Sequence, residues 1–564
     1  ELAEADDRRR ASVRISAPGV RAGTRHGHPH SDDRGATGAV GESLTLRVRV
    51  QVAPCSSIVA LFAHFFALRG GTPPALPTQC ELPFSAAWAL LEHKYNRDNW
   101  DEATALYTTD CTPASAHFYQ TGWCGGGLAT LPLLACGSAL SRARALRNLS
   151  AIFAHSAAPA GGFFGKCRRD GQWEADHAHN QNHRHARRWH LVRRDADMLY
   201  YLQKQVHIIN ADPALRALVA DMAGWHAVLR RGADAFVRRW DTQHQGGHFI
   251  DQVTGVILVG GSASAGLAPA GLILAWQHYG TACYRRVAEA LARYFYEHFI
   301  ARGYTTGGPG DACQCPDSES AGALLESFVV LFEVTGAPEW LAMARDAAHH
   351  CASWVASYDY EFPATSLFGR RGMRSTGAVF ANVQNKHGAP GLCTHSGVSL
   401  FKLFRATGDA RYLALLRDIA HCIPQCVARD DRPLSDPSGR AMPSGWINER
   451  FNTSDWDNNI GGILYGSCWC EIACMLTCAE VPGVYVQSDT GLLCILDHVT
   501  GHVRKDADAT LLTLTNPTRF AATVAVFIER SDEVQRPLGL DTLRGVRRIS
   551  LPAGATTHIN LAGP

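Results

Sequence analysis

The sequence predicts a mainly α-helical protein: an (α/α)6 toroid, six helical hairpins closed into a ring, with a short N-terminal β region and a C-terminal β-sandwich. Three observations predict this: helical periodicity from about residue 85 to 478, an internal repeat, and short strand-like segments after Pro482. We expect a partly disordered arm at 1–40, a β or mixed region at 41–80, the toroidal catalytic domain at 81–481 and the sandwich at 482–564.

Candidate helices follow from apolar residues that recur at helical spacing. They are 85–95, 121–136, 141–155, 195–210, 214–240, 265–279, 283–301, 318–335, 338–357, 390–407, 410–428 and 461–478. The repeat pairs them, because Phe332–Ala342 matches Phe404–Ala414, with a looser copy at Trp276–Tyr284. In each copy a glycine (Gly336, Gly408 or Gly280) ends one helix and the next begins at once, which predicts tight turns.

The links between hairpins are long and rich in His, Asp, Asn, Trp and Gly. They are 156–194, 241–264, 302–317, 358–389 and 429–460. Because short turns and long links alternate, all long links should emerge on one face of the ring, around the mouth of a central cavity. Long ordered loops on a rigid scaffold are where function usually lies.

The flanking regions show strand patterns. Ser43–Ala53 alternates strictly and predicts a strand, and Ile58–Leu68 is assigned to the same small β or mixed region. Short strands separated by turn residues are expected at 485–487, 492–496, 510–515, 521–528, 546–551 and 556–561. For this C-terminal part we expect a packing role against the toroid.

Composition excludes several classes of function. Hydrophobic content of 46% and charged content of 19% are typical of a globular protein, and a net charge of +2 gives no bulk attraction to nucleic acid or an anionic membrane. No apolar run is long enough to span a membrane, and no signal peptide is visible, so we expect a cytoplasmic or periplasmic protein. The oligomeric state, including a homodimer, stays open.

The 18 cysteines are expected to be mostly small buried thiols. The Cys-x-Cys pairs Cys313/Cys315 and Cys468/Cys470 lack the spacing of a structural zinc site. We therefore expect no metal or other cofactor, with zinc kept as a minor alternative.

The densest polar stretch is 168–194, where Asp176, His179 and Arg184 are candidate substrate contacts. An arginine here could pair with a substrate carboxylate. Two alternatives remain: a zinc site among the histidines, and a polar rim that binds loop carbonyls.

Two further stretches carry candidate chemistry. Asp317 and Glu319 begin a helix after a long link, so they are candidate catalytic acids, although helix capping alone would explain them. Asn382, Asn385 and His387 suit a hydroxyl-rich ligand, because amides both donate and accept hydrogen bonds. A structural role for His387 is the alternative.

The link and helix at Pro443–Leu476 add a second pair of acids. Glu449 and Asp455 are candidates for the acid and the base or nucleophile that glycoside hydrolysis requires, with helix capping as the alternative for Asp455. Arg450, Trp446 and Trp456 are candidate substrate contacts. Glu471 lies in an apolar helix and must be either the partner of an arginine or a functional acid.

Together with the toroid, the stretches Pro316–Ser320, Asn382–His387 and Asn448–Trp456 resemble bacterial carbohydrate-active enzymes directed at uronic acids. The architecture and loop style are similar to glycoside hydrolase family 154, the β-glucuronidase type, and more distantly to unsaturated glucuronyl hydrolases. The resemblance implies a uronic-acid-bearing substrate. It assigns no catalytic residue.

We therefore expect an exo-acting glycoside hydrolase that removes a terminal uronic acid, β-glucuronic acid, from a poly- or oligosaccharide. A polysaccharide lyase would use His387 and the amides to eliminate across a uronate. The sequence is also compatible with a sugar-binding toroid without chemistry and with a prenylation-type zinc toroid.

Overall fold

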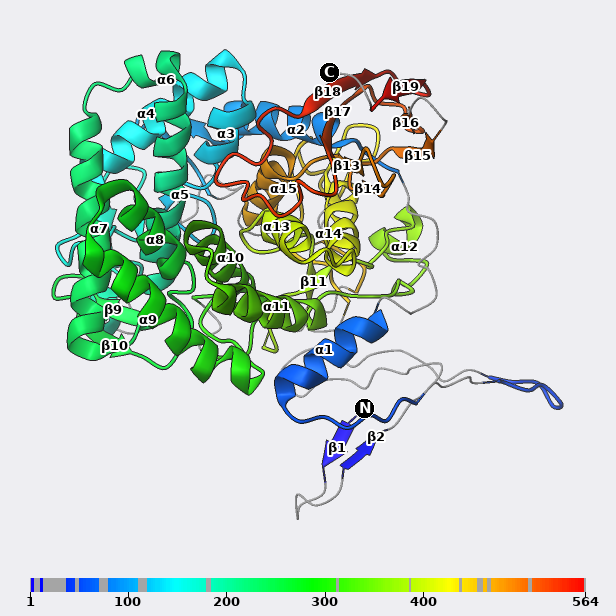
Figure 1. Cartoon of the computed structure of the whole chain (residues 1–564), viewed down its shortest axis with the longest axis horizontal. Coiled ribbons are helices and arrows are strands. Elements are labelled where there is room, and N and C mark those ends of the chain that lie inside the picture. Colours follow the sequence, from blue (N-terminus) through cyan, green and yellow to red (C-terminus); the bar gives the residue numbers. More distant parts are fainter. Residues whose placement is uncertain are drawn as a thin grey trace.

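The computed structural model describes residues 2–4, 11–13, 37–45, 50–69, 80–109, 119–178, 184–310, 314–384, 387–435, 439–453, 460–463, 468–505 and 510–561. Twelve of the described helices form two rings, one inside the other (Figure 1). The inner ring is α3 (Thr130–Cys136), α5 (Val192–Ala211), α8 (Ala268–Tyr279), α10 (Ser318–Thr335), α13 (Val398–Thr407) and α15 (Trp469–Glu480). The outer ring is α4 (Ala139–His155), α7 (Met222–Gln243), α9 (Ala282–His298), α11 (Pro338–Ser353), α14 (Arg411–Cys422) and α2 (Phe84–Lys94).

Each inner helix packs on one outer helix, and neighbouring inner helices α3, α5, α8 and α10 pack on one another. The inner helix α10 is buried on all sides, whereas the outer helix α9 buries one apolar stripe, including Tyr284, Val287 and Leu291. Gly280, Gly336 and Gly408 end α8, α10 and α13 with φ of 70°, 68° and 72°, a left-handed conformation that favours glycine. This is the predicted (α/α)6 toroid with its tight turns.

The remaining helices and strands of this part are short or lie outside the ring. They are β1 (Leu2–Glu4), β2 (Ala11–Val13), α1 (Ile58–Arg69), η1 (Tyr95–Asn99), β3 (Trp100–Asp101), β4 (Leu106–Tyr107), β5 (Tyr119–Gln120), β6 (Lys166–Cys167), β7 (Trp173–Glu174), η2 (Arg184–Arg188), β8 (Trp189–Leu191), α6 (Pro213–Ala217), β9 (Phe249–Asp251), β10 (Ile257–Val259), η3 (Ile300–Arg302), α12 (Leu367–Arg371), β11 (Val379–Phe380), β12 (Gly388–Ala389) and η4 (Pro424–Cys426). In the described residues no helix is long and apolar enough to cross a membrane.

The structure corrects the prediction near the N-terminus. Ile58–Leu68, assigned to a β or mixed region, lies in helix α1, which packs on α11 and stacks Phe66 on Tyr412 at 5.2 Å. A short apolar run fits helix and strand alike, and tertiary packing decided between them here. The described parts of Ser43–Ala53, residues 43–45 and 50–53, form no strand. The N-terminal strands are instead β1 and β2, which pair antiparallel.

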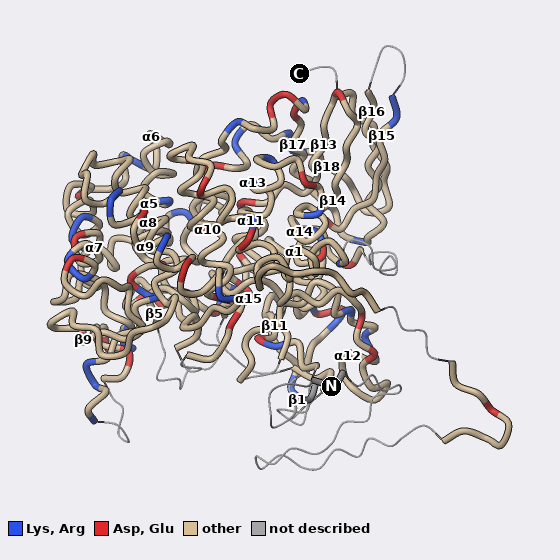
Figure 2. Tube along the Cα trace, turned by 60° about the horizontal axis from the view of Figure 1, so that its bottom comes forward, with Lys and Arg blue, Asp and Glu red and all other residues tan. Residues whose placement is uncertain are grey.

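The C-terminal strands form two small sheets over a shared apolar core (Figure 1). One sheet has the order β14 (Leu493–Ile495), β13 (Val484–Gln487), β17 (Ala522–Glu529), β18 (Arg547–Leu551), and the other β15 (Thr500–Lys505), β16 (Thr510–Thr515), β19 (Thr556–Asn560). The sequence did not predict β15, whose exposed positions carry His502, Arg504 and Lys505. Charges of both signs are intermixed along the whole described chain (Figure 2).

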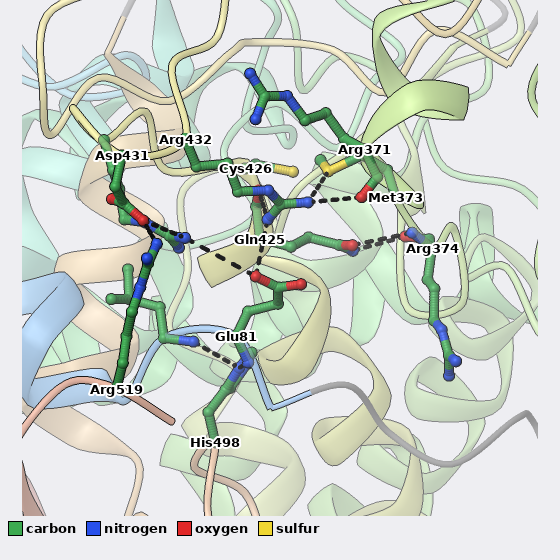
Figure 3. Close-up of polar contacts among 12 residues, drawn as sticks. Glu81, Arg371, Met373, Arg374, Gln425, Cys426, Asp431, Arg432, His498 and Arg519 are labelled. Atoms are coloured by element: carbon green, nitrogen blue, oxygen red, sulfur yellow. Dashed lines mark hydrogen bonds and ion pairs between the residues drawn. The ribbon is translucent and has the colours of Figure 1, made fainter. Parts of the chain in front are cut away.

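A polar cluster fixes the last long link to its surroundings (Figure 3). Arg432 bonds Glu81 at 3.1 Å and the carbonyl oxygens of Gln425 and Arg371 at 3.3 and 3.0 Å. His498, just before β15, accepts a hydrogen bond from the backbone N–H of Glu81 at 2.8 Å. The start of α2, two long links and the C-terminal sheets are therefore held together at this point.

Candidate active site

The N-terminal ends of all inner helices gather at one end of the ring, which we call the mouth. Every inner helix follows a long link, and the outer helices return through short turns or, between α5 and α7, through α6. The five predicted long links all lead to this end, and a sixth, 95–129 before α3, joins them. Helix N-termini carry partial positive charge, so the inner helices contribute positive potential at the mouth.

Three stretches that the sequence singled out lie side by side at the mouth. Asp317 forms a β-bridge with Asn382, and β11 pairs with β12, which begins directly after His387. Gly388 in β12 forms a further bridge with Phe451, two residues beyond Glu449. Links from three different hairpins are thus joined by one run of backbone pairing.

Arg193 is the charged centre of this arrangement. It lies in the first turn of α5 and forms a buried ion pair with Glu319, and its Nε lies 3.4 Å from Asp197. Its guanidinium also donates to the carbonyl oxygens of Gly308 at 3.0 Å and Cys393 at 2.8 Å. Burial works against this charge, but Glu319 and Asp197 raise the pKa of Arg193 above its ordinary value.

Trp123, from the link before α3, is the second group that holds Glu319. Its indole Nε1 donates to Glu319 Oε2 at 3.1 Å, and its backbone N–H donates to Asp197 Oδ2 at 2.8 Å. The Thr394 hydroxyl donates to the Trp123 carbonyl oxygen. Glu319 is only 8% exposed. Its carboxylate accepts hydrogen bonds from both Arg193 and Trp123, and these two donors fix its orientation.

Behind this first cluster lies a second network around His190. His190 lies between two carboxylates, with Nδ1 3.1 Å from Asp176 and Nε2 3.1 Å from Asp195. Burial alone would lower its pKa, but these carboxylates raise the pKa of His190 to about 9. Burial likewise opposes the charge of Asp176, yet Arg194 and His190 hold its pKa well below the ordinary value. Asp176 is thus fully engaged with protein partners, and we propose a structural role for it in place of substrate contact.

Asp317 has the capping role that the sequence left as an alternative. It is fully buried and accepts from the backbone N–H groups of Ser320 at 2.6 Å and Gly308 at 3.1 Å. Burial raises the pKa of Asp317 against the effect of these hydrogen bonds. A side chain so enclosed orients α10, and with it Glu319.

Glu449 is the partly exposed carboxylate of the mouth, next to the equally partly exposed Arg450. Burial raises the pKa of Cys470, and the charge of Glu449 raises it further. Burial also raises the pKa of Cys393, with a further contribution from Glu319. Cys393 also raises the pKa of Cys470, so Glu319 and Glu449 each lie near one of two neighbouring buried thiols.

Other predicted residues are placed differently. Trp446 is only 1% exposed, which suits packing and not stacking on a sugar, and Asn382 and His387 are also buried. Arg184 is exposed in η2 at the rim. His179, Asn385, Asp455 and Trp456 lie outside the described residues.

Glu471 proves to be a structural ion-pair partner. Its carboxylate lies 2.6 Å from Lys94 and accepts from the backbone N–H of Ile447 at 3.3 Å. The expected partner was an arginine, but a lysine of α2 fills this role. Within the described ranges no three His, Cys, Asp or Glu side chains are arranged to hold a metal ion.

Sequence reasoning missed Trp123, Arg193 and Asp197. One signal was available, because Arg193, Arg194, Asp195 and Asp197 directly precede the apolar run Met198–Leu202. Charged residues at the start of a buried inner helix must find partners, and for Arg193 those partners are Asp197 and Glu319.

No family model matches this chain, and no curated protein matches it. Solved structures are distantly similar. A family 76 glycoside hydrolase (mannosidase) from Bacteroides thetaiotaomicron VPI-5482 is 10% identical, with a TM-score of 0.43, covering 70% of this chain and 96% of its own. Cellobiose 2-epimerases from Bacillus thermoamylovorans B4167 and Spirochaeta thermophila DSM 6192 are 11% and 12% identical, with TM-scores of 0.41 and 0.42. They cover 74% and 75% of this chain and 98% of each of their own. Likenesses this distant say nothing about the reaction of this chain.

Proposed function

We propose that this protein is a carbohydrate-active enzyme, an exo-acting glycoside hydrolase that removes a terminal uronic acid, β-glucuronic acid, from poly- or oligosaccharides. The observation that supports the proposal is that links from different hairpins bring an oriented carboxylate, Glu319, and a partly exposed one, Glu449, to the mouth. Hydrolysis of a glycoside by direct displacement needs two carboxyl groups on either side of the scissile bond.

The two carboxyl groups have different surroundings, which suits different roles. Glu319 accepts hydrogen bonds from Arg193 and Trp123, so we assign it the role of the ionised group that activates water or attacks carbon. Glu449 is assigned the role of the acid that protonates the leaving oxygen. Asp455 is an alternative second acid on the same link.

The preference for a uronic acid rests on positive charge at the mouth. The N-terminal ends of the inner helices point there, and Arg450 is partly exposed beside Glu449. Arg450, with Arg184 at the rim, would pair with the substrate carboxylate. A neutral sugar of the same shape would lose this interaction.

The test is a set of matched aryl glycosides, a β-glucuronide and a β-glucoside, together with a uronate-containing oligosaccharide. We expect release of glucuronic acid and a glucuronide-to-glucoside ratio of kcat/KM above about 100, as a desolvated charged pair implies. Formation of an unsaturated product, seen by its ultraviolet absorbance, would identify a lyase instead.

The matched variants are Glu449→Gln and Glu339→Gln. Glu339 is an exposed glutamate paired with Arg293 at 2.7 Å, and it lies in the first turn of the outer helix α11, which begins at the opposite end of the ring from the mouth. We expect Glu449→Gln to lower kcat by about 10²–10⁴-fold, as removal of a general acid does. Activity unchanged in Glu449→Gln would rule out the assigned role, and binding without turnover across the set would indicate a sugar-binding protein.

A further inference from the structure

A second polar cavity lies at the opposite end of the ring from the mouth. It has a volume of about 350 Å³ and lies where α2, the end of α3, the start of α4 and the end of α15 meet β17 and β18. In Figure 1, α2 and α3 lie next to β17 and β18. Since α3 and α15 end here and begin at the mouth, the cavity is separate from the candidate active site.

Two arginines line this cavity without a carboxylate partner in the described part of the chain. Arg142 comes from α4, and its Nε is buried without a hydrogen bond, while its Nη2 reaches only the Ala135 carbonyl oxygen at 3.5 Å. Arg548 comes from β18, and its side chain is exposed. Both guanidiniums lie close enough to Cys136 to lower its pKa, against the larger effect of burial that raises it.

The acidic groups nearby are engaged elsewhere or lie at the edge. Asp497, which also lines the cavity, accepts from the backbone N–H groups of Phe84 and His498, both at 2.7 Å. Glu480 also acts on Cys136, but it forms a buried ion pair with Lys204. Asp541, the other acid that acts on Cys136, lies in the exposed segment before β18. The positive charge of the two arginines is therefore left for a ligand.

The other walls suit a small organic molecule. Trp88 of α2 presents a half-buried aromatic surface, and Ser85 is held in place by the Thr523 N–H, which donates to its hydroxyl at 2.8 Å. Ligand cavities of this size typically combine an apolar wall with a few placed polar groups. Arginine is the side chain best suited to carboxylates and phosphates.

We propose that this cavity is a second binding site, for a small organic anion whose carboxylate or phosphate lies between Arg142 and Arg548 and whose body contacts Trp88. The site does not depend on the proposed hydrolase activity. It joins the toroid to the C-terminal sheets, so its occupant bridges both parts and stabilises them against separation.

The test is calorimetric titration of the full chain with three probes: inorganic phosphate, glucuronate and neutral glucose. We expect phosphate or glucuronate, or both, to bind in this cavity, and glucose not to bind there. Glucuronate that binds at the mouth is told apart because Arg548→Gln leaves it unchanged. The stronger of the two anions identifies which oxyanion the site takes. Binding should weaken at least about 10-fold in Arg548→Gln, since a charge-assisted hydrogen-bonded contact is lost.

Two matched variants separate this site from other sources of binding. Arg547→Gln removes the neighbouring arginine of β18, whose Nη1 donates to the Asn560 carbonyl oxygen at 3.1 Å, and should leave affinity unchanged. Glu449→Gln alters the mouth and should leave the Arg548-dependent binding unchanged. Equal affinities in Arg548→Gln and Arg547→Gln, or no heat with either anion at millimolar concentration, would overturn the proposal. Because Arg548 is exposed, its variant folds even where Arg142→Gln does not.

Discussion

The two ends of the ring both contain buried ion pairs, but the pairs fix different groups in place. At the mouth, Arg193 and Trp123 hold the carboxylate of Glu319 by hydrogen bonds, and Glu449 on another link is partly exposed. At the opposite end, Lys402 of α13 binds Glu333 at 2.6 Å and the Gly539 carbonyl oxygen at 2.7 Å. The second pair fixes the C-terminal segment onto the ring.

Buried charge alone does not mark a functional site. Arg405 and Glu529 lie 2.6 Å apart and are as buried as Arg193 and Glu319, and Arg405 also donates to the Arg536 carbonyl oxygen at 2.6 Å. The partners of Arg405, which are Glu529 and the carbonyl oxygens of Glu533 and Arg536, all lie in the C-terminal part, so this pair joins the ring to that part. The mouth differs because long links bring acids from several hairpins together beside partly exposed groups.

The largest expected difference between the two ends is in catalysis. Glu319→Gln should lower kcat by about 10³-fold, close to 4 kcal/mol in activation free energy, because the ionised carboxylate is lost. Glu333→Gln removes an equally paired glutamate at the opposite end and should leave kcat unchanged. Steady-state kinetics on the aryl β-glucuronide measure kcat for both variants. Thermal unfolding of both variants is the control. Equal losses of kcat in the two variants would remove the functional distinction between the ends.

The next effect is on stability at the end away from the mouth. Arg405→Ala leaves Glu529 buried without its partner, and breaking such a pair costs about 3–5 kcal/mol. Tyr485 still donates to Glu529 at 2.8 Å, so the loss should fall at the lower end of that range. Denaturant unfolding measures it, and proteolysis should cut the C-terminal part first. A loss below about 1 kcal/mol would show that the pair does not join the two parts.

A smaller effect concerns pH and the network behind the mouth. The pKa of His190 is about 9 in the folded protein and 6.5 ordinarily, so its protonated form stabilises the fold below pH 6.5. That contribution, about 3 kcal/mol, disappears as the pH rises through 9. Denaturant unfolding at both pH values should show the decline in the parent chain, and His190→Gln should flatten it. A parallel decline in the variant would assign the pH dependence to other groups.

Much of the ring could be predicted from the sequence, because its signals are local. Helical periodicity and the glycines at 280, 336 and 408 specify helices and turns without reference to distant residues. Helix starts were less predictable: the segments expected from 121, 390 and 461 begin at Thr130, Val398 and Trp469. There the link residues contain small and apolar side chains that mimic a helix, although the described residues among them form turns and loops.

The partners within the site could not be predicted in the same way. Arg193 and Glu319 are 126 positions apart, and Trp123 lies 196 positions from Glu319. Nothing in the local pattern around Trp123 or Arg193 states which acid it meets. Only ring closure, which brings the link before α3 and the start of α5 next to the start of α10, establishes those contacts.

The smallest expected effect is that of Arg184, which lies at the rim of the mouth and not in its interior. Arg184 is exposed in η2, so Arg184→Ala should change the free energy of unfolding by less than about 0.5 kcal/mol. If its guanidinium meets the substrate carboxylate, KM for the glucuronide should rise about 3–10-fold with kcat unchanged, as expected for binding lost equally from ground and transition states. The glucoside is the internal control, because it has no carboxylate to lose. An equal rise in KM for both substrates would place Arg184 outside uronate recognition and leave Arg450, beside Glu449, as the arginine that distinguishes the two sugars.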